Sequence, residues 1–218
     1  MKKFLVVMLA LMSFMVKPAH ALEKVEAQTS TISIERESKG DNFSSESDMI
    51  IKRMESAIKS LPSSNNIDYN FLSEMILLHS EGIQLSIVIQ GYTDNPEIIN
   101  YASDLVDYEN GELTEMRIAR KDLLDKKDTA TKGNDAYLKE FDNLVKDRFN
   151  KLYGYTKVND PAKDYVNIMN LWNQADVDLA ATYLKYSDND VVRKIAENII
   201  NVKTGQIAKG EELLRTLK

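Results

Sequence analysis

The strongest constraint on the fold of this chain is an internal repeat. Residues 71–116 recur without a gap, 94 positions later, as residues 165–210. Both copies keep the same helix-break signal, and eight of the 46 aligned positions are identical. Two copies of a helical hairpin commonly fold against each other into one bundle. The clearest matches are Met75 with Met169, Leu85 with Leu179, Tyr92-Thr93-Asp94-Asn95 with Tyr186-Ser187-Asp188-Asn189, Ala102 with Ala196, and Gly111 with Gly205.

Apolar residues recur along the chain at three- and four-residue spacing, and no segment alternates with a period of two. This spacing is typical of amphipathic helices. We therefore predict an all-α fold: a ferritin-like antiparallel bundle of two repeated helical hairpins plus a short N-terminal helix. The bundle domain is expected over residues 45–218, with repeat one at 67–126 and repeat two at 160–217. The predicted helices cover residues 45–61, 68–90, 96–126, 134–153, 161–186 and 189–217.

Side chains that accept hydrogen bonds from a first helical turn mark the helix starts, and a proline at the first helical position strengthens two of them. A glycine after the first long helix predicts a left-handed stop. The expected capping residues are Asp68, Asn95 before Pro96, Asp160 before Pro161, and Asp188, and the expected stop is Gly91.

The first 21 residues have the pattern of an export signal. Lys2-Lys3 precede an apolar stretch over residues 4–16, and Ala19-His20-Ala21 form a small-residue cleavage site. We expect cleavage after Ala21 and a periplasmic or secreted product. Residues 22–44 are rich in polar residues, so we interpret them as a flexible leader. The chain has no cysteine, which excludes disulfides, thiolate metal sites and attachment of a lipid to cysteine.

The charge of the chain limits its partners. Removing residues 1–21 takes away three lysines and no acid, so the net charge of −6 becomes −9. An acidic chain without a basic stripe is a poor binder of nucleic acid or of an anionic membrane surface. We expect an unknown protein or small ligand of the cell envelope as partner, no nucleic acid, and no membrane span once the signal is removed.

The repeat predicts a polar layer inside the bundle. Glu109 interrupts the apolar face of the 96–126 helix, and His79 interrupts that of the 68–90 helix. The second copy carries Asn173 and Lys203 at the matching positions. If the two hairpins pair about a pseudo-twofold axis, these four side chains share one level, and a Glu109–Lys203 contact would satisfy both charges.

The turn of the first hairpin centres near residue 93 or 94, and this position predicts which residues of its two helices face each other. Equal distances from this turn place His79 opposite residues 108–109, Met75 opposite Glu112, and Phe71 opposite Met116. In this arrangement, His79 is expected to form a hydrogen bond with Glu109.

Three motifs of the first copy resemble the domain-of-unknown-function 305 family. They are Phe71-Leu72-x-x-Met75-x-x-x-His79-x-x-x-Ile83, Pro96-Glu97-Ile98 with Ala102, and Glu109-x-x-Glu112-Leu113-x-x-Met116. The resemblance covers about residues 67–217. It implies an exported or membrane-associated ferritin-like bundle of two hairpins, and some members of the family bind copper in the periplasm through Met and His.

The departures from the family pattern fall at its polar positions. Leu78 stands where the family has the first residue of a His-His pair, and Glu109 replaces a Gln. In the second copy, Trp172-Asn173 replace the His pair, Lys203 replaces the Gln and Gly210 replaces the final Met. His79 is therefore the only imidazole after residue 21.

These residues argue against an enzyme. A di-iron centre needs two Glu-x-x-His motifs, and Ile76 stands three residues before His79. Covalent haem attachment needs cysteine, and no Gly-x-Ser-x-Gly elbow is present. We predict a non-enzymatic binding or interaction module that needs no cofactor.

Two alternatives stay open. A copper or other transition-metal site could use Met75, His79, Glu112 and Met116, because thioethers and an imidazole suit Cu(I). Lys203 in the same layer would repel such a cation. Alternatively, the leader and first helix, residues 22–61, could dock a partner.

Overall fold

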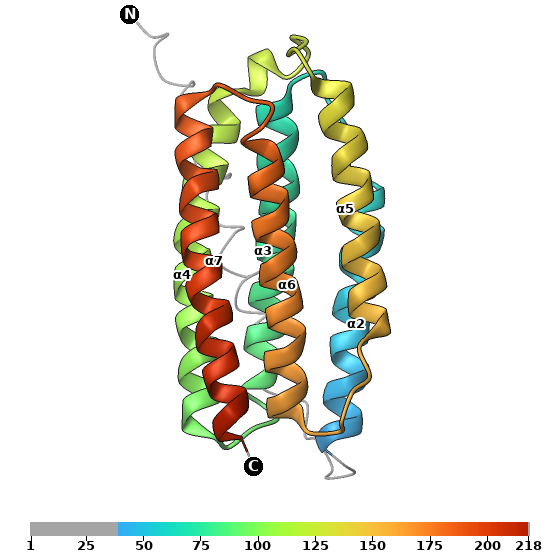
Figure 1. The fold of residues 1–218 in the computed structure, drawn as a ribbon, viewed down its shortest axis with the longest axis vertical. Coiled ribbons are helices and arrows are strands. Elements are labelled where there is room, and N and C mark those ends of the chain that lie inside the picture. Colours follow the sequence, from blue (N-terminus) through green and yellow to red (C-terminus); the bar gives the residue numbers. More distant parts are fainter. Residues whose placement is uncertain (1–38, 218) are drawn as a thin grey trace, which may run out of the picture. The chain divides into compact units, whose positions relative to one another are not determined.

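The computed structural model describes residues 39–217 (Figure 1). All regular elements in this range are helices, which confirms the all-α prediction. The predicted signal peptide, residues 1–21, lies outside the described residues. The helices are α2 (Lys39–Lys59), α3 (Ile67–Ile89), α4 (Pro96–Asp122), the short 3-10 helix η1 (Leu124–Lys126), α5 (Asn134–Gly154), α6 (Pro161–Tyr183) and α7 (Asp190–Thr216).

The duplicated unit has three helices rather than two. α2 and α5 each have 21 residues, α3 and α6 each have 23, and α4 and α7 each have 27. α6 begins 94 residues after α3, and α7 begins 94 residues after α4, which is the spacing of the sequence repeat. The prediction of two hairpins plus a short extra helix is corrected in this respect: α2 is the counterpart of α5.

Burial extends the repeat across α2 and α5. Six positions that are buried in α2 have a buried counterpart 94 residues later in α5. None of these buried pairs is identical; the identities at the 94-residue spacing fall instead on exposed or half-buried positions, such as Asp41 with Asp135 and Lys52 with Lys146. The pairs are Gly40 with Asn134, Phe43 with Tyr137, Ser47 with Phe141, Ile51 with Val145, Met54 with Arg148, and Ile58 with Leu152.

The helices of the described unit form three pairs of counterparts. α3 and α6 lie between the α4–α7 pair and the α2–α5 pair (Figure 1). The two helices of each pair run in opposite directions, as a twofold axis perpendicular to the bundle requires. Because α3 and α6 are covered on both sides, they bury more residues than the outer helices do.

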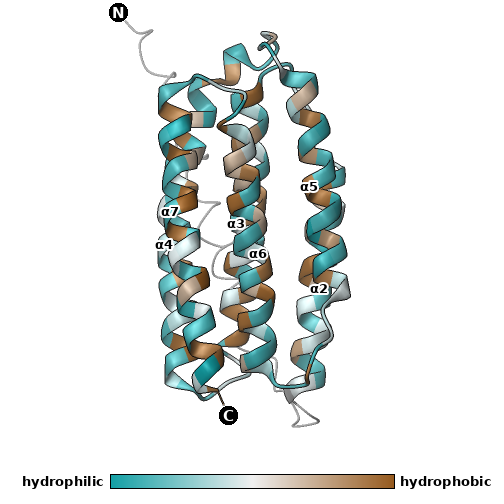
Figure 2. Cartoon of the chain, in the orientation of Figure 1, coloured by the Kyte–Doolittle hydropathy of each residue, from teal (hydrophilic) through white to brown (hydrophobic). Residues whose placement is uncertain are grey.

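The central position of α3 explains its apolar composition (Figure 2). By length and hydropathy alone, Ile67–Ile89 could cross a membrane, but 67% of its most apolar window is buried inside the unit. Buried core helices of soluble proteins satisfy the same two criteria. The absence of a membrane span stays a prediction.

Two of the expected helix starts are confirmed. Asn95 accepts a hydrogen bond from the backbone N–H of Glu97, and Pro96 is the first residue of α4. Asp160 accepts hydrogen bonds from the first turn of α6, which begins at Pro161. In both cases the capping side chain satisfies amide groups that have no partner within the helix.

The other predicted caps are wrong. Asn66, rather than Asp68, caps α3 through the backbone N–H of Tyr69, and Asn189, rather than Asp188, caps α7. The backbone of Gly91 does not adopt the predicted left-handed conformation, because the only glycine with positive φ among residues 39–217 is Gly133.

Asp68 instead joins the two repeats. Its carboxylate accepts hydrogen bonds from Tyr183, Ser187 and Asn189, all from the end of α6 or the loop that follows it. These hydrogen bonds therefore join repeat one to repeat two at this end of the bundle.

The predicted leader, residues 22–44, is too long. α2 begins at Lys39, and Phe43 is fully buried with its ring 5.8 Å from that of Tyr92. The packing of this buried ring stabilises helical structure before the predicted start at residue 45. α2 is thus part of the core, and the hypothesis that residues 22–61 dock a partner stays a prediction.

Glu74 of α3 connects the central pair to α5. It is buried and accepts a hydrogen bond of 2.6 Å from the hydroxyl of Tyr137. Burial raises the pKa of Glu74 to about 8, although the Tyr137 hydrogen bond acts in the opposite direction. The folded protein therefore keeps a proton on Glu74 at pH values where the unfolded chain has released it.

We expect Glu74→Gln to flatten the pH dependence of stability. Because the folded pKa of Glu74 is raised from 4.5 to about 8, the wild type should lose stability as pH rises through this window, on the order of 3 kcal/mol. The variant keeps an acceptor for Tyr137 and should lose much less. Urea unfolding at pH 5, 6.5 and 8.5 measures this difference, with the exposed Glu211→Gln as control. Parallel wild-type and Glu74→Gln profiles would contradict the assignment.

Candidate functional site

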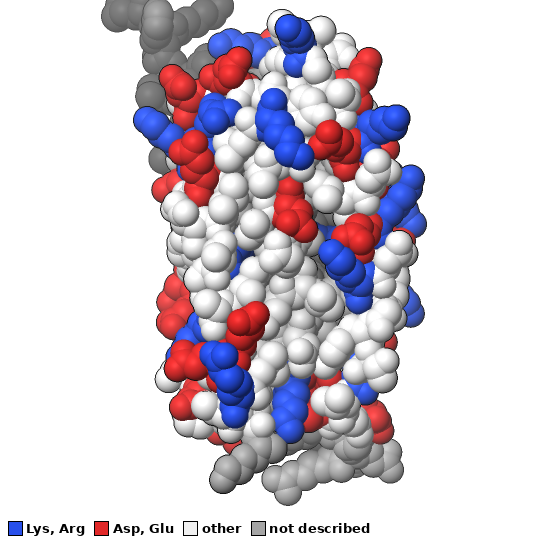
Figure 3. Space-filling view, viewed as in Figure 1, with Lys and Arg blue, Asp and Glu red and all other residues white. Residues whose placement is uncertain are grey.

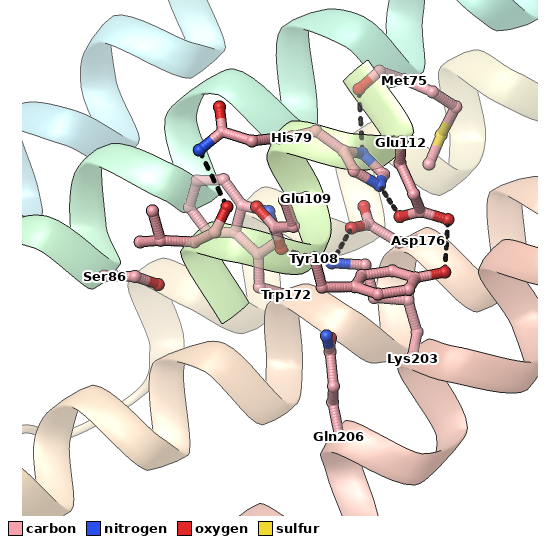
Figure 4. Close-up of polar contacts among 12 residues, drawn as sticks. Met75, His79, Ser86, Tyr108, Glu109, Glu112, Trp172, Asp176, Lys203 and Gln206 are labelled. Atoms are coloured by element: carbon pink, nitrogen blue, oxygen red, sulfur yellow. Dashed lines mark hydrogen bonds and ion pairs between the residues drawn. The ribbon is translucent and has the colours of Figure 1, made fainter. Parts of the chain in front are cut away.

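A layer of charged and polar side chains lies inside the bundle, and Figure 4 shows part of it, including His79, Glu109 and Lys203. Five helices contribute to it, and every member is buried. We call this set the ionic layer: His79 from α3, Glu109 and Glu112 from α4, Arg148 from α5, Asn173 and Asp176 from α6, and Lys203 from α7.

The predicted contact between Glu109 and Lys203 is present. Lys203 Nζ lies 2.5 Å from Glu109 Oε1, and the two side chains are 0% and 1% exposed. The residues are 94 positions apart, so each is the counterpart of the other in the repeat. Under a twofold operation, counterparts can touch only near the axis. This ion pair therefore lies at the pseudo-twofold axis.

Lys203 also faces a second carboxylate. Asp176 Oδ2 is 3.7 Å from Lys203 Nζ. Burial lowers the pKa of Lys203, but the charges of Glu109 and Asp176 outweigh this effect, so the pKa is raised above its usual value. The ammonium form of Lys203 is thus the one that the fold stabilises.

Arg148 and Asp176 form a second buried ion pair, which the sequence analysis missed. Arg148 is 1% exposed and donates hydrogen bonds to Asp176 Oδ1 and to the carbonyl oxygen of Trp172. Burial raises the pKa of Asp176, but the charges of Arg148 and Lys203 outweigh this effect and lower it overall.

A signal for this second pair was present in the sequence. Arg148 stands seven residues after Phe141, three after Val145 and four before Leu152, and is thus a charge in a core position. Asp176 stands three residues after Asn173 on the inward face of α6.

Gly82 makes room for the carboxylate of Glu109. It is the counterpart of Asp176 in the repeat, so one repeat carries a side chain where the other has none. A Cβ atom at Gly82 would lie 2.9 Å from Glu109 Oε2 and 3.4 Å from Trp172 Nε1. The Glu109 carboxylate therefore packs directly against the backbone of α3.

His79 is bonded differently from the prediction. Its Nδ1 donates to the carbonyl oxygen of Met75 (3.0 Å), and its Nε2 lies 2.9 Å from Glu112 Oε2. The expected hydrogen bond to Glu109 and the facing of Met75 with Glu112 are therefore wrong. The partner of His79 is three residues, or about one turn, farther along α4 than the turn-centred estimate placed it.

Glu112 extends this network to the surface. Its Oε1 accepts a hydrogen bond of 2.8 Å from the hydroxyl of Tyr108, and that hydroxyl accepts one from the exposed Asn198. Asn173 belongs to the same level and is fully buried. Its amide makes no hydrogen bond with another protein atom in the described part of the chain.

The alternative copper set of Met75, His79, Glu112 and Met116 does not fit this geometry. Both imidazole nitrogens of His79 are engaged, one by a backbone oxygen of Met75 and the other by Glu112. Among residues 39–217, no group of three or more His, Cys, Asp or Glu side chains is arranged to hold a metal ion. Lys203 and Arg148 already supply positive charge to the layer.

Comparison with known proteins agrees with this fold. The family model "Domain of unknown function (DUF305)" matches residues 12–120, which is half of the chain and includes most of the first repeat. The resemblance over residues 67–217 predicted a match that also included the second repeat. No curated protein matches the chain.

A solved structure, the crystal structure of a DUF305 fragment from Deinococcus radiodurans, aligns with 72% of this chain and 100% of its own chain. The TM-score is 0.53 and the sequence identity is 14%. At this identity, the likeness supports the fold alone.

Proposed function

The chain belongs to the DUF305 family, and from this premise we propose that it is an exported, non-enzymatic binding or interaction protein of the cell envelope. In this proposal the position that holds a ligand in some relatives is closed here by the ionic layer. The protein then acts through its outer surface.

The single observation that carries the proposal is the buried Glu109–Lys203 ion pair. At these two positions the family resemblance expects uncharged Gln residues. An acid and an amine neutralise each other there and use the space and the hydrogen bonds that a ligand would need. A buried ion pair is costly to open, because either charge alone would be left without compensation.

The mixed charges and exposed apolar side chains on the surface of the bundle favour a protein partner over a polyanion. On the face drawn in Figure 3, lysines and arginines are interspersed with aspartates and glutamates, and no extended basic stripe is visible. Large exposed apolar side chains occur on several elements, including Met49 on α2, Ile118 on α4 and Val191 on α7. A protein partner is therefore favoured over a nucleic acid.

Copper binding provides the test. A ligand that binds only the folded state stabilises it, by about 2.7 kcal/mol at a hundredfold excess over its dissociation constant. We expect anaerobic Cu(I) titration to leave the Tm unchanged, and we expect protein purified from the periplasm or medium to carry no stoichiometric metal.

The decisive control for the copper test is a Met75→Leu/His79→Ala double variant. A Tm increase with Cu(I) that is present in the wild type and lost in this variant would replace our proposal with the copper-handling function. A Tm increase that persists in the variant would locate binding outside these residues.

A further inference from the structure

In the described part of the chain, several buried polar atoms in the ionic layer and beside it have no hydrogen-bond partner in the protein. They belong to five side chains, all of them fully or almost fully buried. Leaving such a group unbonded costs about 1–3 kcal/mol, and native proteins usually satisfy it with protein or ordered water. These atoms are Glu109 Oε2, Arg148 Nε, Trp172 Nε1, both amide atoms of Asn173, and Asp176 Oδ2.

Two of these atoms lie close enough for one small molecule to bridge them. Glu109 Oε2 and Trp172 Nε1 are 2.9 Å and 3.4 Å from the same point, the position of a Cβ atom at Gly82. They cannot be farther apart than these two distances combined, which is about twice the length of a hydrogen bond. Figure 4 shows the Glu109 carboxylate next to the Trp172 indole.

The chemistry of the unbonded atoms selects water as the occupant. Trp172 Nε1 and Arg148 Nε can only donate, whereas Glu109 Oε2 and Asp176 Oδ2 can only accept. A cation would satisfy only the acceptors and would be repelled by Lys203 and Arg148. An anion would satisfy only the donors and would face three buried carboxylates. Water donates and accepts, and a buried molecule typically makes about three hydrogen bonds.

We propose that the ionic layer holds buried water, with one molecule accepting a hydrogen bond from Trp172 Nε1 and donating one to Glu109 Oε2 beside Gly82. This site goes beyond the proposed function and stands independently of it, because it concerns the interior of the bundle. The layer departs from pseudo-twofold symmetry at this place, because one repeat supplies Gly82 and the other supplies Asp176.

The single tryptophan of the chain makes the test specific. Trp172 is the only tryptophan, so the full chain labelled with nitrogen-15 gives one indole N–H signal. We expect a cross-peak between this proton and a long-lived water molecule. A crystal structure at high resolution should show a density peak within hydrogen-bond distance of Glu109 Oε2 and Trp172 Nε1.

Two glycine substitutions provide a matched pair. In Gly82→Ala, the new methyl group must displace the Glu109 carboxylate, so the cross-peak should be lost. In Gly205→Ala, the methyl group meets no atom within 4 Å, so the cross-peak should remain.

Three results would overturn the proposal. The first is a wild-type structure without a density peak at this position. The second is a peak that anomalous scattering identifies as a metal ion. The third is a cross-peak that persists unchanged in Gly82→Ala. If Gly82→Ala does not fold, the wild-type structure still decides.

Discussion

Replacing Lys203 with methionine should lower the free energy of unfolding by about 3–5 kcal/mol. Lys203 is fully buried between the carboxylates of Glu109 and Asp176. Its removal leaves Glu109 in the core without a counter-charge, whereas Asp176 keeps its ion pair with Arg148. The loss of charge compensation, rather than of packing, dominates the effect, because methionine is an apolar side chain of similar length. Chemical denaturation at pH 7 measures it.

The design of this experiment separates charge from volume. In the double variant Glu109→Gln/Lys203→Met, the uncompensated acid is also removed. We expect its stability to exceed that of Lys203→Met by at least about 1 kcal/mol, because contacting residues in one network are coupled. Lys209→Met is the surface control, since Lys209 is about half exposed in its pair with Glu212, and such pairs contribute about 0–1 kcal/mol. Equal losses in Lys203→Met and Lys209→Met would refute the central role of the buried pair.

Arg148→Met should be the second most damaging change, with a loss of about 3–5 kcal/mol at pH 7. The counterpart of Arg148 in the first repeat is Met54, so methionine at this position of the helix is compatible with the fold. The variant nevertheless removes the main counter-charge of Asp176.

The loss of stability caused by Arg148→Met should depend on pH in a direction that follows from the pKa of Asp176. Because the folded pKa of Asp176 is lowered, its ion pair contributes stability above the unfolded pKa of about 3.9 and loses it as pH falls through the folded pKa. The difference between wild type and Arg148→Met should therefore shrink in acid. Arg53→Met is the control, because Arg53 pairs with Glu81 at the surface and its side chain is 55% exposed. A difference that grows in acid would contradict the ion-pair explanation.

Trp172 offers an independent measurement for the same variant. The Arg148 guanidinium lies 5.7 Å from the centroid of the Trp172 ring. Its removal should change the emission of the only tryptophan while the far-ultraviolet circular dichroism keeps its helical form.

Part of the ionic layer could be predicted because the repeat indicates which residues lie close together in the folded bundle. Glu109 and Lys203 interrupt the same apolar face at counterpart positions, and counterparts meet near a twofold axis. His79 was placed at the correct level but given the wrong partner. A rotation or slide of about one turn between two antiparallel helices leaves their apolar spacing unchanged, so the sequence could not distinguish Glu109 from Glu112.

Other members of the layer depended on a helix that the sequence comparison did not align. α2 and α5 share buried positions but not the residues at those positions, as Met54 and Arg148 illustrate. Without that correspondence, Arg148 had no assigned place in the core and Asp176 had no partner. The burial of Phe43 similarly extended α2 into the predicted leader.

The sequence by itself determined the helical class, the duplication and the helix starts at Asn95 and Asp160, because periodicity and capping are local properties of the chain. It also determined that an acid and an amine must meet inside the bundle, because an unpaired charge there is too costly. Only the tertiary structure decided which carboxylate faces His79, which helix supplies Arg148, and why Gly82 has no side chain. These choices depend on how far each helix slides and rotates against its neighbours, and that is set by the packing of all six long helices together.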